Sequence, residues 1–249
     1  MINDYKNQAA VWDWDGYDDS AEHEYWCRYA QQYGQKVLIP MCAHGKMGAY
    51  MAENNFQVTA FDLSPDMIVE GKKRFGSTKS LELLVADLLT LDLAEKNFDF
   101  AFLAGNGDLH LIQPIENVKK ALLSIRKHMR TGACLVLELT LPTKESWSYP
   151  KTVFHPRVPN HTDKKIWKEN EGRYDADEKR NYINQTVYIE TTKGVESFEQ
   201  SICLQYYERD EIVKILNDSG FNIASEYCNR QKETWKSSDN TWIVEAIAL

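Results

Sequence analysis

The segment at 36–75 (KVLIPMCAHGKMGAYMAENNFQVTAFDLSPDMIVEGKKRF) constrains the fold more than any other part of the chain. Residues 37–41 form an apolar run, short enough for a strand that is buried on both faces. A turn at 42–45 leads into a segment at 46–53 that can form a helix. A second apolar strand follows at 57–61. This order of elements predicts the first half of a nucleotide-binding α/β fold.

An acid stands at the tip of the second predicted strand, where such folds bind their ligand. Asp62 lies 17 residues after Gly45, close to the spacing of about 20 between the turn and the acid that accepts hydrogen bonds from ribose hydroxyls. Ser64 can cap the next helix, with Pro65 at its first position. We therefore expect a nucleotide-like ligand past the strand ends, against the turn and the helix N-terminus. The alternative is a generic βαβ unit with a surface aspartate.

The turn itself indicates which nucleotide to expect. Its sequence, AHGKMG at 43–48, contains neither G-x-G-x-x-G nor the phosphate-binding loop G-x-x-x-x-G-K-[ST]. A pyrophosphate requires close approach of the backbone, which repeated glycines permit. A turn with fewer glycines favours a ligand without a pyrophosphate, and it disfavours a nicotinamide-dependent oxidoreductase.

Five stretches over residues 36–140 resemble the motifs of class I S-adenosylmethionine-dependent methyltransferases, in their order and at their distances. They are VLIPMCAHGKM, VTAFDLSPDM, LLVADLLTLDL, FDFAFLAGNGDLHLI and LLSIRKHMRTGACLVLEL. The resemblance implies an α/β fold with a Rossmann-like, seven-stranded mixed sheet and helices on both faces. It also implies S-adenosyl-L-methionine as the cofactor and S-adenosyl-L-homocysteine as its product.

The first motif departs from the family. Ile39 and Pro40 stand where the family usually has an acid that contacts the methionine amine, so another group must replace that contact. Ile39-Pro40-Met41-Cys42 looks more like the corresponding strand of thiopurine-type methyltransferases. This match keeps a thiol or oxygen acceptor as an alternative.

The resemblance also implies which residues bind the cofactor. Asp87 follows the third predicted strand, at the position that meets the adenine amino group. In the small-molecule enzymes an N-terminal segment closes over the cofactor, and aromatic faces can hold its sulfonium by cation–π attraction. The expected cofactor-binding residues are Tyr5, Trp12, Met41, Ala43, Gly45, Asp62, Leu63, Met67, Asp87, Leu88, Gly105 and Asn106.

The loop after the fourth predicted strand, GNGDLHL at 105–111, resembles the G-N-S-F-x-H-L stretch of glycine, sarcosine and amino-sugar N-methyltransferases. The resemblance implies that His110 is catalytic, because it can orient an amine or accept its proton. The alternative is a histidine that caps the next helix or bonds to backbone. Asp108 is also possible as a base, without precedent in the family. Tyr17, His110 and Tyr207 are the expected substrate-binding residues.

Residues 141–206 break the alternation of strands and helices. Four prolines and three stretches of alternating polarity, at 165–173, 180–190 and 195–205, predict an antiparallel β meander inserted after the fifth strand. Related enzymes use such a sheet as a lid or an oligomer interface, so a monomer and a homodimer are both possible. The polar connection at 228–240 is expected to be mobile.

We expect a single methyltransferase domain over 1–249. Within it, residues 1–35 are the predicted N-terminal lid and helix, and 36–140 the cofactor-binding core. The inserted sheet at 141–206 is followed by a C-terminal helix and hairpin at 207–249.

Composition restricts the partners. A net charge of −8 argues against a nucleic-acid substrate, which requires a basic face. There is no apolar run of about 20 residues for a membrane span and no apolar signal region at the N-terminus. Five widely spaced cysteines without a C-x-x-C pair indicate a reduced cytoplasmic protein with no metal site.

These observations together predict an S-adenosylmethionine-dependent methyltransferase of a small molecule, with N-methylation of an amine as the main hypothesis. Thiol or oxygen methylation is the first alternative. An alternative from another class is an inactive cofactor-binding protein with a regulatory or interaction role, which the irregular first motif suggests.

Overall fold

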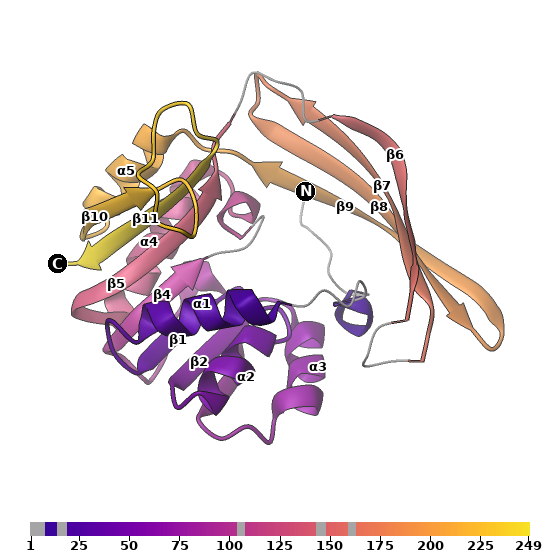
Figure 1. Ribbon diagram of the computed structural model, residues 1–249, viewed down its shortest axis with the longest axis horizontal. Coiled ribbons are helices and arrows are strands. Elements are labelled where there is room, and N and C mark those ends of the chain that lie inside the picture. The colour runs from indigo at the N-terminus through magenta and orange to yellow at the C-terminus, as the bar shows by residue number, and fades with distance from the viewer. Residues whose placement is uncertain (1–7, 14–18, 104–107, 143–147, 159–162) are drawn as a thin grey trace.

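The fold comprises two sheets, seen in the computed structural model of Figure 1. One is a seven-stranded sheet with helices packed on it, and the other is a separate four-stranded sheet. The structure describes residues 8–13, 19–103, 108–142, 148–158 and 163–249.

The seven-stranded sheet is mixed. Five neighbouring strands are parallel, and the last two strands of the chain form an antiparallel hairpin at one edge. The order reverses between β1 and β4, the position at which open α/β sheets bind ligands past their carboxyl ends. In spatial order the strands are β10 (Phe221–Tyr227), β11 (Thr241–Ala248), β5 (Met129–Thr140), β4 (Phe98–Leu103), β1 (Lys36–Pro40), β2 (Gln57–Asp62) and β3 (Leu81–Val85).

Helices cover both faces of this sheet because its central strands are apolar on both faces. In β1, Leu38 belongs to the cluster that contains residues of α4 and α5, whereas Val37 and Ile39 belong to the cluster with α1 and α2. The fold class expected from the sequence is thereby confirmed. The helices are η1 (Ala9–Val11), α1 (Ser20–Ala30), α2 (Lys46–Glu53), α3 (Pro65–Phe75), η2 (Leu88–Thr90), η3 (Leu109–Leu111), α4 (Ile115–His128) and α5 (Arg209–Asp218), where η marks a 3₁₀ turn.

None of the helices in the described ranges is long and apolar enough to cross a membrane.

The second sheet is inserted between β5 and α5. Its strands are antiparallel neighbours in chain order, and Figure 1 shows it curving away beyond the carboxyl edge of the seven-stranded sheet, with η1 between that sheet and the insert. The strands are β6 (Tyr149–Arg157), β7 (Ile166–Asp175), β8 (Arg180–Thr191) and β9 (Gly194–Gln205).

Strand β6 was not expected from the sequence, which predicted three strands in this insert. It contains Pro150 and Pro156, and proline cannot donate to a sheet ladder. The structure places β6 at the edge of the sheet, where one side of the strand needs no partner. Proline is therefore tolerated at these two positions.

Two further expectations are corrected. Thr131-Gly132 in the fifth motif predicts a turn before the fifth strand, but both residues lie inside β5, where the register against β4 shifts. The connection at 228–240, expected to be mobile, is held by ion pairs. Arg230 pairs with Glu22 at 2.8 Å and with Glu138 at 3.0 Å, and Lys232 pairs with Glu245 at 3.0 Å.

Candidate functional site

A cavity of about 730 Å³ opens at the carboxyl ends of the parallel strands. Its volume lies in the range of small-molecule sites. The residues that line it come from the end of η1, the carboxyl ends of β1, β2 and β3, the first turn of α3, η2, and the stretch from the start of η3 to the first turn of α4. They are Trp12, Met41, Ala43, Phe61, Asp62, Leu63, Ser64, Pro65, Asp66, Met67, Ala86, Asp87, Leu88, Leu89, Asp108, Leu111, Ile112, Gln113 and Asn117.

The turn between β1 and α2 forms one wall. Met41 and Ala43 adopt left-handed backbone conformations (φ 53° and 50°), and Gly45 (φ 83°) is the N-cap of α2. Such conformations cost energy for residues other than glycine and persist only where the surroundings impose them. Here the surroundings include Asp62, whose Oδ2 accepts a hydrogen bond from the Ala43 N–H at 2.9 Å.

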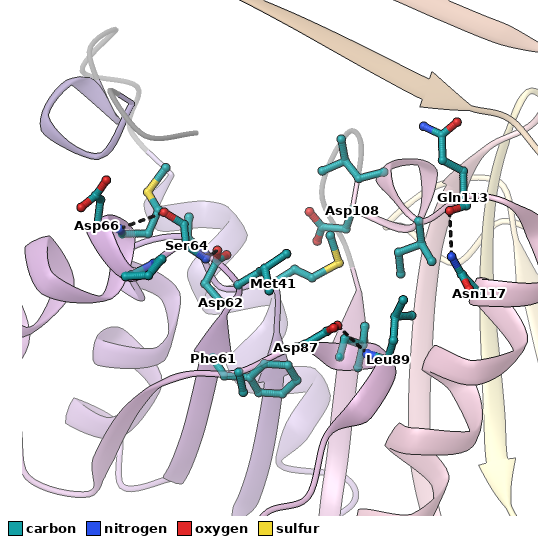
Figure 2. A pocket seen from close by; sticks show the side chains of 18 of the residues that line it. Met41, Phe61, Asp62, Ser64, Asp66, Asp87, Leu89, Asp108, Gln113 and Asn117 are labelled. Carbon is teal, nitrogen blue, oxygen red and sulfur yellow. Dashed lines mark hydrogen bonds between the residues drawn. The ribbon is translucent and has the colours of Figure 1, made fainter. Parts of the chain in front are cut away.

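Asp62 connects two segments of the site. Its other oxygen, Oδ1, accepts from the Ser64 N–H at 2.9 Å, and Ser64 in turn caps α3. Burial raises the pKa of Asp62, while the N–H groups of Ser64 and Ala43 act in the opposite direction. A carboxylate has about four acceptor sites, so these two bonds leave capacity for ligand hydroxyls. Figure 2 shows Asp62 beside Ser64 at the cavity wall.

Asp87 occupies the corresponding place after β3. Its Oδ1 accepts from the Leu89 N–H at 2.9 Å and so caps η2. Leu63, Met67 and Leu88 line the same cavity and provide apolar surface suited to a flat base. Leu63 is 65% exposed, so its side chain is accessible to a ligand.

The N-terminal segment, here residues 8–13, lies over the cavity. Trp12 lines it, and the next residue, Asp13, lies 2.7 Å from His44 Nε2 and accepts from Arg74 at 3.2 Å. Burial by itself raises the pKa of Asp13, but the hydrogen bond with His44 and the charges of His44, Lys46 and Arg74 lower it to about 2. The segment is therefore fastened to the β1–α2 turn and to α3.

The same segment also reaches the inserted sheet. Val11, which is fully buried, packs in one cluster with Ile166 of β7 and Val187 of β8. Trp12 is thus flanked by two anchoring residues: Asp13 contacts the domain that contains the seven-stranded sheet, and Val11 packs against the inserted sheet.

His110 is buried between the two sheets. Its Nδ1 lies 3.0 Å from the Gln205 carbonyl at the end of β9, and its Nε2 accepts from the Thr140 N–H at 3.2 Å at the end of β5. The inserted sheet leaves the core after β5 and returns after β9, so this one ring joins both connections. Burial lowers the pKa of His110 to about 4, although the bond to Gln205 acts against this. This arrangement agrees with the backbone-bonded alternative, and the catalytic role stays a prediction that the geometry does not support.

Other expected site residues divide into three groups. Tyr207 does not line the cavity: it is buried, and its hydroxyl donates to the Ile112 carbonyl at 2.5 Å. Substrate binding by Tyr207 stays a prediction that this position does not support. Gly45 shapes the turn without lining the cavity. Tyr5, Tyr17, Gly105 and Asn106 lie outside the described residues.

Sequence reasoning did not place Gln113 and Asn117 in the site. Gln113 donates from its amide to the Cys203 carbonyl of β9 at 3.2 Å, and Asn117 donates to the Gln113 carbonyl at 2.9 Å. Both follow the fourth parallel strand, at the edge where ligands bind. Their position after that strand was the sequence signal that could have placed Gln113 and Asn117 in the site.

The cavity has a distinct electrostatic character. Four carboxylates line it, from Asp62, Asp66, Asp87 and Asp108, and no lysine, arginine or histidine is among its described lining residues. A site of this kind attracts cations and repels anions.

The comparisons with known proteins agree with this architecture. Residues 37–132 match the sequence profile of the family described as methyltransferase domain. No curated protein sequence matches the chain.

Solved structures of low sequence identity share the fold over nearly the whole chain. An S-adenosylmethionine-dependent methyltransferase from Clostridium acetobutylicum is 14% identical, covers 98% of each chain and superposes with a TM-score of 0.76. The sugar N-methyltransferase KedS8 from a Streptoalloteichus species is 14% identical over 98% of this chain and 93% of its own, with a TM-score of 0.76.

The amino pentose methyltransferase CalS10 from Micromonospora echinaspora, solved with S-adenosylmethionine bound, is 16% identical over 96% of this chain and 95% of its own, with a TM-score of 0.71.

Residues 37–132 thus match a methyltransferase domain, and the chain as a whole has the fold of solved S-adenosylmethionine-dependent methyltransferases. The resemblance drawn from the five sequence motifs is confirmed.

Proposed function

We propose that this protein transfers the methyl group of S-adenosylmethionine to the nitrogen of a small amine. The single observation that carries the choice of nitrogen is the set of four cavity carboxylates without a basic lining residue. An amine is neutral or cationic near neutral pH, whereas thiols and phenols become reactive as anions, which this cavity repels.

The residues present fit the cofactor. Asp62 retains acceptor capacity for ribose hydroxyls, and Leu63, Met67 and Leu88 offer an apolar surface for the adenine, next to Asp87. When bound, S-adenosylmethionine supplies an activated methyl group on a positively charged sulfur, and the cavity carboxylates are complementary to that charge.

The protein contributes alignment and exclusion of water. The β1–α2 turn, held by Asp62, fixes one side of the site, while Trp12 and the attached N-terminal segment cover it. Holding two reactants in line can lower a barrier by about 7–11 kcal/mol, so a protein base is not required for a large rate. This agrees with the position of His110, whose ring nitrogens both have backbone partners.

The proposal is tested with purified protein, S-adenosylmethionine and a panel of amines, amino acids, amino sugars, thiols and phenols. Release of S-adenosylhomocysteine is measured for each compound. Turnover with amines is expected. Methylation of thiols or phenols alone would overturn the nitrogen assignment, and calorimetric binding without turnover across the panel would favour the inactive regulatory alternative.

A further inference from the structure

We propose that the Asp108 carboxylate binds the amine nitrogen of the acceptor and makes the site selective for ammonium-forming substrates. This inference rests on the proposed function and assigns the residue that recognises the acceptor. It replaces His110 as the residue nearest the chemistry on the acceptor side.

Asp108 stands at the side of the cavity away from the ribose-binding acid. It follows β4, whereas Asp62 ends β2, and β1 lies between these two strands. Figure 2 shows Met41, the residue after β1, between the carboxylates of Asp62 and Asp108, with the Asp108 carboxylate directed into the cavity. Two acids thus face the cavity from opposite sides.

The side chain of Asp108 is not used to cap its own helical turn. Asp108 is the N-cap residue of η3, yet its side chain makes no capping hydrogen bond. By contrast, Asp87 caps η2 and Ser64 caps α3 through their side-chain oxygens. Asp is favoured at N-caps because it makes this bond. The Asp108 carboxylate therefore lines the cavity instead of capping η3.

The surroundings of Asp108 favour a cationic ligand. Met41, Leu111 and Ile112 line the cavity with it and are apolar. Burial raises the pKa of Cys42 in the β1–α2 turn well above its usual value, and the charges of Asp62 and Asp108 add to this effect. Both carboxylates therefore act on the same turn. A partly desolvated carboxylate gains most from a cation held by a charge-assisted hydrogen bond.

Methyl transfer to nitrogen moves positive charge toward Asp108. An amine that binds as its ammonium first loses a proton to water, because an ammonium has no lone pair. The nitrogen lone pair then forms the new N–C bond while the C–S bond breaks and its electron pair stays on sulfur. The sulfur becomes neutral, and the nitrogen gains both the methyl group and the positive charge. A carboxylate beside the nitrogen therefore stabilises the transition state more than the ground state of a neutral amine, which is the condition for catalysis.

The test uses a probe that needs no identified acceptor. Sinefungin is an analogue in which a carbon that bears an amine replaces the methyl-bearing sulfur, so its ammonium extends toward the acceptor. Calorimetry compares its affinity with that of S-adenosylhomocysteine for the wild type and for Asp108→Asn. We expect the preference for sinefungin to fall about tenfold or more in Asp108→Asn, as for a lost charge-assisted bond, with S-adenosylhomocysteine binding within about twofold.

Two matched variants complete the test. Asp92→Asn removes an exposed carboxylate that does not line the cavity and should leave the ratio of the two affinities unchanged. Asp108→Glu keeps the charge and should retain part of the preference. Thermal melting of each variant establishes that it is folded.

Equal weakening of both ligands in Asp108→Asn would overturn the inference, because it would place the carboxylate at the methionine amine that both ligands share. An unchanged ratio in Asp108→Asn would overturn it as well. Failure of the proposed function gives a different result: the wild type then binds neither ligand, or methylates only thiols or phenols.

Discussion

The carboxylate of Asp13 lies 2.7 Å from Nε2 of His44, and this contact joins the N-terminal segment to the turn that forms one wall of the cavity. His44 is almost fully buried, and Arg74 of α3 adds a second hydrogen bond to the same carboxylate oxygen. Because Trp12 precedes Asp13 and lines the cavity, this contact fixes the position of Trp12 at the cavity.

Asp13→Asn should therefore weaken retention of the cofactor. Loss of a hydrogen-bonded charge costs about 1.5–3 kcal/mol, so dissociation of S-adenosylhomocysteine should become roughly tenfold faster or more in stopped-flow measurements. The exposed ion-pair partner Asp218 provides the control, and Asp218→Asn should release the ligand at the wild-type rate. Equal rates for wild type and Asp13→Asn would show that the contact does not hold Trp12 at the cavity.

The same contact has a defined pH dependence. Asp13 has a pKa of about 2 in the folded protein against an ordinary value of 3.8. Its stabilisation is therefore fully present above about pH 4 and is lost as the pH falls toward 2. The Asp13→Asn variant should lose less stability than the wild type over this window in acid titrations followed by circular dichroism.

Asp62→Asn should reduce cofactor affinity. The amide keeps the shape of the side chain but removes the charge, and it replaces one acceptor of the Ala43 and Ser64 N–H groups by a donor. A loss of about 1.5–3 kcal/mol, or roughly tenfold or more in Kd, is expected by calorimetry with S-adenosylhomocysteine. Asp92→Asn, at an exposed position, is the control. A wild-type Kd for Asp62→Asn would remove Asp62 from the ribose contact.

His110 should make stability pH-dependent. Its pKa is about 4 when folded and 6.5 ordinarily, so between these values the unfolded chain binds more protons. Its contribution is present above pH 6.5 and falls by up to about 3 kcal/mol as the pH drops to 4. In urea titrations at several pH values, His110→Gln should show a flatter dependence across this window. His155→Gln, at an exposed position of β6, should retain the wild-type slope, and equal slopes in all three proteins would contradict the assignment.

Gly71→Ala should destabilise the junction of α3 and the β1–α2 turn. A Cβ atom at position 71 would lie 2.2 Å from the carbonyl oxygen of His44, which is backbone and cannot rotate away. Overpacking of this kind costs about 1–3 kcal/mol, and displacement of the turn should also weaken cofactor binding. Val69→Ala, on the exposed side of the same helix, should change the unfolding free energy by less than about 0.5 kcal/mol. Thermal or urea denaturation distinguishes the two variants.

The sequence by itself determined the features that depend on local periodicity and on residues at strand ends. The five parallel strands and the helices between them were predictable because buried strands and amphipathic helices have distinct apolar periods. Asp62 and Asp87 could be assigned because Asp62 ends one strand and Asp87 lies two residues after another, and parallel strands place such residues along one edge.

Only the tertiary structure decided how side chains from distant segments meet. His110 bonds to backbone 30 and 95 residues away, and no local pattern distinguishes such a joint from a catalytic base. The contact of Asp13 with His44 and the edge position of β6 likewise depend on how separate segments pack. The direction in which Asp108 points has the same origin, because an N-cap aspartate either caps its helix or faces a cavity according to what the rest of the fold places beside it.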